Sequence, residues 1–264
     1  MPRLLLQHHR KGLHAIVVLG VLLMAPAASW AQVKVIISGG FTGPYERLLP
    51  EFEKTTGIQV QTGSGASQGS GPQTIGAQLA RGVVADVLIL SREGLTELIQ
   101  AGRIAAGSDV DLARTPLGVA VRAGAPKPAV QTVEQFKRLV TNAKLVAMPG
   151  STSGLFLRDE IFPRLGLVGQ VHARLMPRGA DAAALVASGE ADVGLLPVSE
   201  IVHAPGVELA GVIADEIQLH QIFAAAVVAN SAQIGPAKRL IAFFKSAQAV
   251  AAIEQAGMVP LQQP

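Results

Sequence analysis

Short runs of apolar residues alternate along this chain with longer segments in which apolar positions recur at helical spacing. The run at 33–37, for example, precedes a segment at 45–56 that places Leu48 and Phe52 on one helical face. This alternation is typical of α/β layers. The predicted strands cover residues 33–37, 58–62, 86–90, 117–122, 144–148, 175–177, 193–197 and 222–228, and the predicted helices cover 45–56, 72–81, 93–101, 133–140, 155–165, 180–188, 235–244 and 247–256.

The order of these segments predicts two α/β lobes. The strand at 117–122 leaves the first lobe, and the apolar strand at 222–228 returns to it. Two such crossings would form a hinge, and the ligand cleft would lie between the lobes. We expect a first lobe of residues 32–117 plus 227–264 and a second lobe of residues 118–226.

The first residues of the chain, 1–31, resemble a secretory signal peptide. Basic residues precede an apolar run at 15–24, and Ser29 and Ala31 occupy the −3 and −1 positions of a cleavage site before Gln32. The alternative is a membrane anchor, but a span needs about 20 apolar residues and this run is shorter. We therefore expect a periplasmic protein with no membrane span after cleavage.

Charge and aromatic content argue against a nucleic-acid partner. The formal net charge of +3 is accounted for by Arg3, Arg10 and Lys11, so the chain after the signal is balanced. Trp30 is the single tryptophan and also lies in the signal, which leaves few platforms for stacking bases.

The residue types for metal and thiol chemistry are scarce. Cysteine is absent, which excludes iron–sulfur clusters, thiol catalysis and thiolate zinc sites. His172, His203 and His220 are widely spaced in the sequence, and a surface or hydrogen-bonded role is the simpler interpretation of each. We expect no metal site and no cofactor.

Loops rich in glycine and hydroxyl side chains follow several predicted strands, and such loops present N–H and O–H donors to small anions. Tight turns, exposed loops, helix capping and, for the aromatic residue, core packing are the alternative roles. The candidate ligand contacts are Ser38, Gly39, Gly40, Phe41, Ser64, Ser67, Gln68, Ser151, Thr152, Ser153 and Ser199.

Three ionisable residues could add chemistry to a small-anion site. Arg178 follows a predicted strand, where a guanidinium could bind a carboxylate through two hydrogen bonds; a surface arginine is the alternative. Glu200 or His220 could transfer a proton if the protein is an isomerase. For Glu200 the alternative is an acid in the first turn of a helix, where the helix dipole stabilises it.

With these features the chain resembles the molybdate-binding-protein-like family of periplasmic solute-binding proteins. The resemblance is carried by the first strand with its Gly/Ser turn, by segment 79–89 with its Ala-Asp-Val, and by segment 188–194. It covers essentially all of the chain after the signal. It implies a type II periplasmic-binding-protein-like α/β fold with two hinge crossovers, which closes on a small anionic ligand and works with an ABC-type permease.

Two departures from the family pattern bear on the ligand. The family's molybdate binders have a Ser where this chain has Gly40 and a Tyr where it has Pro197. The loss of two oxyanion donors favours an organic (poly)carboxylate over molybdate. The family also includes an exported aconitate isomerase, so two hypotheses remain: a monomeric binding protein for a small organic anion, and a cofactor-free isomerase that interconverts cis- and trans-aconitate.

Overall fold

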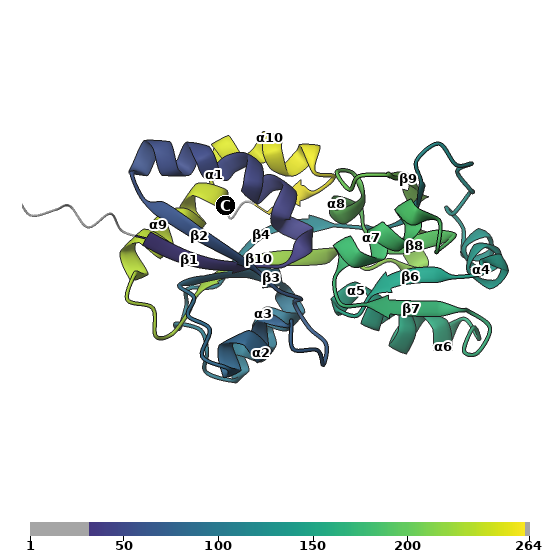
Figure 1. Ribbon diagram of the computed structural model, residues 1–264, viewed down its shortest axis with the longest axis horizontal. Helices are drawn as coiled ribbons and strands as arrows, with labels where there is room; N and C mark the ends of the chain where they lie inside the picture. The colour runs from purple at the N-terminus through teal and green to yellow at the C-terminus, as the bar shows by residue number, and fades with distance from the viewer. Residues whose placement is uncertain (1–31, 262–264) are drawn as a thin grey trace, which may run out of the picture.

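Residues 32–261 are described by the structure, a computed structural model in which two α/β lobes lie side by side along the long axis (Figure 1). The expected signal peptide, 1–31, lies outside the described residues and stays a prediction. Within residues 32–261 no helix is both long and apolar enough to cross a membrane.

The first lobe is built on a sheet with the strand order β11-β4-β10-β3-β1-β2. β1 pairs in parallel with β2 and β3, whereas β10 runs antiparallel to β3 and β4. The elements are β1 Gln32–Ile37, the short 3₁₀ turn η1 Gly39–Phe41, α1 Thr42–Thr56, β2 Gln59–Ser64, α2 Ile75–Ala80, β3 Val87–Ser91, α3 Arg92–Gln100, β4 Val110–Thr115, β10 Gln221–Val227, α9 Ile234–Phe244, α10 Ala247–Gln255 and β11 Val259–Pro260.

Both faces of this sheet are covered by helices, which explains why its central strands are apolar throughout. Val87 and Ile89 of β3 pack into the cluster beneath α1, α9 and α10, while Leu88 and Leu90 point into the cluster beneath α2 and α3. Figure 1 shows α1 and α10 on one side of the sheet and α2 and α3 on the other.

The second lobe has a sheet with the strand order β7-β6-β8-β5-β9, in which β6 is parallel to β7 and β8. Its core also has two faces, one under α4 and the α5–α6 segment and one under α7. The elements are β5 Leu117–Arg122, α4 Val133–Asn142, β6 Val146–Pro149, α5 Thr152–Phe156, the short π-helix η2 Leu157–Ile161, α6 Phe162–Arg164, β7 Ala173–Met176, α7 Gly179–Ser188, β8 Val193–Pro197, α8 Val198–Ile201 and β9 Val207–Val212.

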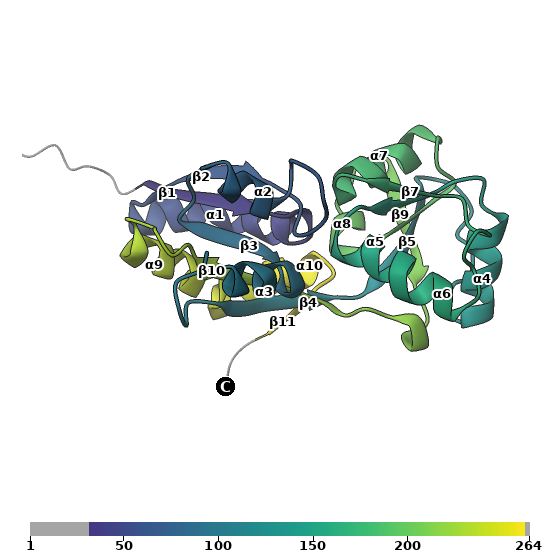
Figure 2. The same ribbon diagram turned by 90° about the horizontal axis from the view of Figure 1, so that it is seen from below.

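Two segments connect the lobes, as the view from below shows most clearly (Figure 2). The chain leaves the first sheet after Thr115 and enters the second at Leu117, so the first crossing is a single residue, Pro116. It returns through residues 213–220, which include the 3₁₀ turn η3 Asp215–Ile217. β10 belongs to the first sheet from Gln221 onward, so the change of lobe precedes the boundary at 226–227 expected from the sequence.

Strands β4, β9 and β11 were not among the expected elements. β4 carries Asp111 and Arg114, and β9, at the edge of its sheet, is only half-buried along much of its length. Because such strands lack a continuous apolar run, hydrophobic patterning alone does not identify them. β4 and β9 form instead by pairing with the long apolar strands β10 and β5, and β11 pairs with β4.

Candidate active site between the lobes

Loops at the carboxyl ends of strands from both lobes converge on one polar cavity of about 20 Å³. Open α/β sheets place their ligand sites at this end of the strands. The first sheet and its loops contribute Ser38, Gly39, Gly65, Ala66, Ser67, Gln221 and Phe223. The second lobe contributes Pro149, Ser151, Ser153, Arg178, Gly179 and Glu200.

The first lobe offers three polar side chains to this cavity. Ser38 and Gln221 are 4 % exposed, and neither Ser38 Oγ nor Gln221 Oε1 has a hydrogen-bond partner among the described residues. Ser67 Oγ accepts a hydrogen bond of 2.9 Å from the backbone N–H of Ser91, so its own proton remains available to a ligand. Buried polar atoms without partners are costly, and a ligand that binds them removes that cost.

The second lobe contributes hydroxyls and charges. Ser151 and Ser153 lie where β6 turns into α5, and Arg178 immediately precedes α7. The Arg178 guanidinium lies at the cavity wall and also donates to Asp181, at 3.0 Å from Nη2 and 3.3 Å from Nε. This hydrogen bond raises the pKa of Arg178 above its ordinary value, so the site keeps its positive charge.

Direct hydrogen bonds hold the lobes together beside the cavity. Ser91 Oγ lies 2.7 Å from Thr152 Oγ1, which in turn donates to Gln68 Oε1 at 2.7 Å. The backbone N–H of Gln68 donates to Ser151 Oγ at 3.2 Å. The structure is therefore a closed form, and because the cavity has room for about one water molecule, an organic anion fits only when the lobes stand further apart than they do here.

Replacing Thr152 by valine is expected to favour the open form. The change keeps the shape of the side chain but removes the bonds to Ser91 and Gln68, which hydrate freely once the lobes part. We expect closure of the ligand-free protein to weaken by about 1–2 kcal/mol, a shift of roughly 5- to 30-fold toward the open form. Small-angle scattering without ligand measures this shift. Thr55→Val is the control, because among residues 32–261 the Thr55 hydroxyl bonds only to carbonyls of its own helix, α1. Equal effects of the two variants would contradict the prediction.

Glu200, at the first turn of α8, is the acid enclosed by the two lobes. Its Oε1 lies 2.8 Å from the position that a Cβ on Gly39 of the first lobe would take, and its Oε2 only 1.3 Å from that of a Cβ on Gly179 of the second. The carboxyl therefore fits because both neighbours are glycines. Oε2 is buried and unpaired among the described residues. Burial raises the pKa of the Glu200 carboxyl from 4.5 to about 7.

This raised pKa predicts that stability falls as the pH rises. The folded protein holds the Glu200 proton up to about pH 7, whereas the unfolded chain releases it near 4.5. Below pH 4.5 the Glu200 carboxyl is protonated in both the folded and the unfolded state, so burying it does not lower stability through ionisation. Above pH 7 folding must bury an ionised carboxylate, which costs about 3 kcal/mol. In urea unfolding, we expect the difference in unfolding free energy between wild type and Glu200→Gln to change by about 3 kcal/mol between pH 4.5 and pH 7. A difference independent of pH would contradict the assignment.

The other expected site residues lie in several environments. Ser199 is buried and lines an adjoining groove between the lobes, and Gln68 and Thr152 bridge the lobes. Gly40 contacts the ring of Phe223, since a Cβ there would lie 1.9 Å from that ring. Four residues lie away from the described cavity and are withdrawn as ligand contacts or bases: Gly40, Phe41 in the core against Phe244, and the exposed Ser64 and His220.

Gln221 is the polar cavity residue that sequence reasoning missed. It begins β10, immediately before the apolar run taken as the returning strand. A lone polar residue at the start of a strand that crosses between lobes was the available signal. Gly179 was also missed, and its role becomes visible only when the position of the Glu200 carboxyl is known.

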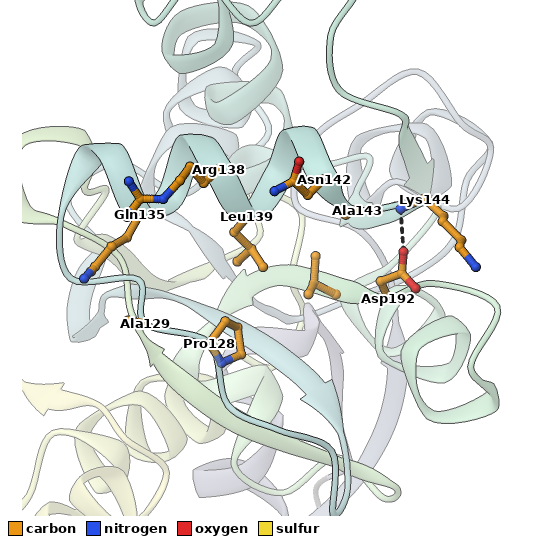
Figure 3. Close-up of a pocket in the computed structure, with 10 residues that line it drawn as sticks. Pro128, Ala129, Gln135, Arg138, Leu139, Asn142, Ala143, Lys144 and Asp192 are labelled. Carbon is orange, nitrogen blue, oxygen red and sulfur yellow. Dashed lines mark hydrogen bonds between the residues drawn. The ribbon is translucent and has the colours of Figure 1, made fainter.

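A larger open groove of about 600 Å³ lies on the second lobe, lined by residues of α4 and by Lys144 and Asp192 (Figure 3). The backbone N–H of Lys144 donates to Asp192 at 2.5 Å, so the acid helps to join β6 and β8. Because all of its lining residues come from one lobe, hinge closure cannot enclose a ligand there. We therefore take the smaller cavity between the lobes as the candidate functional site.

The fold and the site together define a two-lobed solute-binding protein of type II topology, with a polar cavity at the hinge. The chain belongs to the family described as bacterial extracellular solute-binding protein, whose model matches residues 33–259. Within it the chain is of the molybdate-binding-protein-like kind, which includes aconitate isomerase.

Individual proteins of known name are also similar to this chain. The chain is 34% identical to an aconitate isomerase from a Pseudomonas species, over 92% of this chain and 95% of that protein. It is 28% identical to the molybdate-binding protein ModA of Azotobacter vinelandii, over 70% of this chain and 72% of that one. The solved sulfate-binding protein SubI of Mycobacterium tuberculosis matches the fold, with a TM-score of 0.69, 21% identity and coverage of 88% of this chain and 87% of that chain.

Proposed function

We propose that this protein interconverts cis- and trans-aconitate by acid–base chemistry of its own side chains. The observation that carries the proposal is Glu200, a carboxyl enclosed between the lobes whose pKa burial raises to about 7. Proton transfer is most effective when the pKa of the acid–base group lies near the working pH. The 34% identical relative named aconitate isomerase supports the same reaction.

The reaction is an allylic proton shift. In its ionised form Glu200 takes a proton from the methylene carbon of aconitate, and the electron pair of that C–H bond becomes part of a new carbon–carbon double bond. The old double bond opens toward the former vinylic carbon, which then receives a proton from the Glu200 carboxylic acid. Both carbons flank the same central carbon, so one carboxyl can serve both. Closure of the lobes keeps bulk water away from the carbanionic intermediate.

The polar groups around Glu200 are suited to anchoring the substrate carboxylates. Ser38 and Ser67 can donate from the first lobe and Ser153 from the second, while Arg178 supplies positive charge at the wall. Gln221 can donate through its carboxamide from β10. Anchors on both lobes couple substrate binding to closure, which brings Glu200 to the reacting carbons.

A second function is favoured by the hydrogen bonds that join Gln68 of the first lobe to Ser151 and Thr152 of the second. Closure stabilised in this way also suits a binding protein that carries an organic anion to an ABC-type permease and needs no proton transfer. In that case the protonated Glu200 carboxyl would donate a hydrogen bond to an oxygen of the ligand. For either function we propose that residues 1–31 are removed as a signal peptide and that the mature protein acts in the periplasm, which the family of extracellular solute-binding proteins supports.

Two measurements distinguish these functions. In the first, purified protein is incubated with trans-aconitate or with cis-aconitate, and the other isomer is followed by proton NMR. In the second, thermal shifts are recorded with both aconitates, citrate, molybdate, tungstate and sulfate. Isomerisation by wild type supports the enzyme. Stabilisation by an organic acid without turnover supports the binding protein, and stabilisation by molybdate alone contradicts both.

A further inference from the structure

A groove of about 530 Å³ adjoins the far side of Glu200 from the cavity. It runs between α1 of the first lobe and α7 and α8 of the second, and its α7 wall is made of the small residues Ala180, Ala183, Ala184 and Ala187. Glu200 and Gly39 line both the groove and the enclosed cavity. The Glu200 carboxyl therefore lies between the enclosed cavity, where the reaction would take place, and a groove that is open to solvent.

His203 lines the same groove, in the turn that follows the end of α8 at Ile201. Both side chains face the first lobe: Glu200 Oε1 lies 2.8 Å from the Cβ position of Gly39, and Cδ2 of His203 lies 3.3 Å from that of Gly43, four residues further along the chain. The imidazole is exposed, so it has contact with both the groove and water.

We propose that Glu200 exchanges its proton with solvent through this groove, with His203 as the relay. The inference rests on the proposed isomerase function. After Glu200 has taken the methylene proton, that proton passes through groove water to the His203 imidazole, and the imidazolium releases it to bulk water. A solvent proton returns by the same route to the Glu200 carboxylate and is delivered to the vinylic carbon. The proton gained by the product is then not the one that the substrate lost.

The charged groups around Glu200 give this route a direction. Arg178 faces the cavity side, where its positive charge favours bound carboxylates over protons. On the groove side lie Glu46 of α1 and His203, both exposed, and Glu46 attracts protons and hydronium to the mouth. Imidazole is the side chain that most readily gains and loses protons near neutral pH. His203 exchanges protons with Glu200 and does not contact the substrate, so its effect on the reaction is indirect.

The test is isotopic. Unlabelled trans-aconitate is converted in heavy water by the full mature chain, and the deuterium content of the cis-aconitate formed in the first turnovers is measured by mass spectrometry. Most wild-type product is expected to carry one deuterium. His203→Gln, which removes the relay, and Ala184→Leu, which fills the groove from an exposed helical position, are each expected to lower the deuterium content by roughly twofold or more. Matched controls are His172→Gln and Ala251→Leu, both at exposed positions outside the groove.

A purely structural role for His203 would lower the rate and leave the deuterium content unchanged. Unlabelled product from an active wild-type protein overturns the exchange route while the isomerase function stands. Deuterium content equal in wild type and in both groove variants overturns the assignment to this groove. A wild-type protein that interconverts neither isomer overturns the isomerase function, and the exchange route with it.

Discussion

Glu200→Gln is expected to lower the rate of aconitate isomerisation by about 10²- to 10⁴-fold, the usual contribution of a positioned acid–base group. Glutamine has nearly the shape of the glutamic acid that it replaces, so the packing against Gly39 and Gly179 is retained. It cannot remove a proton from carbon. The loss should appear in kcat, with little change in the affinity for substrate, because the anchoring hydroxyls are untouched.

Three companion measurements give this result its meaning. Glu190→Gln replaces an acid of the same lobe that is 62% exposed, and should leave activity unchanged. Thermal shift with aconitate should be similar for Glu200→Gln and wild type. Above pH 7 the variant should be more stable than wild type, because it no longer buries an ionised carboxylate. Full activity of Glu200→Gln would remove Glu200 from the mechanism and favour the binding-protein function.

The two-lobed fold was predictable because its central strands are buried on both faces and therefore appear as continuous apolar runs. β3 and β8 are of this kind, and both were expected from the sequence within a residue or so of their ends. The polar or half-buried strands β4 and β9 were not predicted, since their formation depends on partners distant in the sequence. Local patterning therefore identified the buried central strands and the exposed edge strands β2 and β7, but not β4 or β9.

The candidate site could be predicted in outline only. Hydroxyl-rich loops after β1, β2 and β6 indicated the carboxyl ends of the strands, and Ser38, Ser67 and Ser153 do lie at the cavity. Which residue of a loop faces inward depends on the turn, so Gly40 packs on Phe223 while Gly39 meets Glu200. The raised pKa of Glu200 could not be predicted, because it arises from burial that only the assembled lobes produce.

Gly179→Ala is expected to reduce isomerisation by about 100-fold or more, although it adds one methyl group at the first position of a helix. The new Cβ would lie 1.3 Å from Glu200 Oε2 and 2.5 Å from the carboxyl carbon. No side-chain adjustment of alanine relieves such an overlap, so the Glu200 carboxyl must leave its place or α7 must shift. A misplacement of about 1 Å in a reacting group is enough for a loss of this size.

Gly235→Ala is the matched control, because Gly235 also lies in the first turn of a helix and has nothing within 4 Å of its Cβ position. There the change should be neutral or stabilise the protein by about 0.5–1 kcal/mol, as alanine usually does in a helix. The decisive comparison is the double variant. If Gly179 acts by leaving room for the Glu200 carboxyl, Gly179→Ala should cost little further activity once Glu200→Gln is present, since the two changes then remove the same function. Independent, multiplying losses would instead show that α7 contributes to activity by some route other than the Glu200 carboxyl.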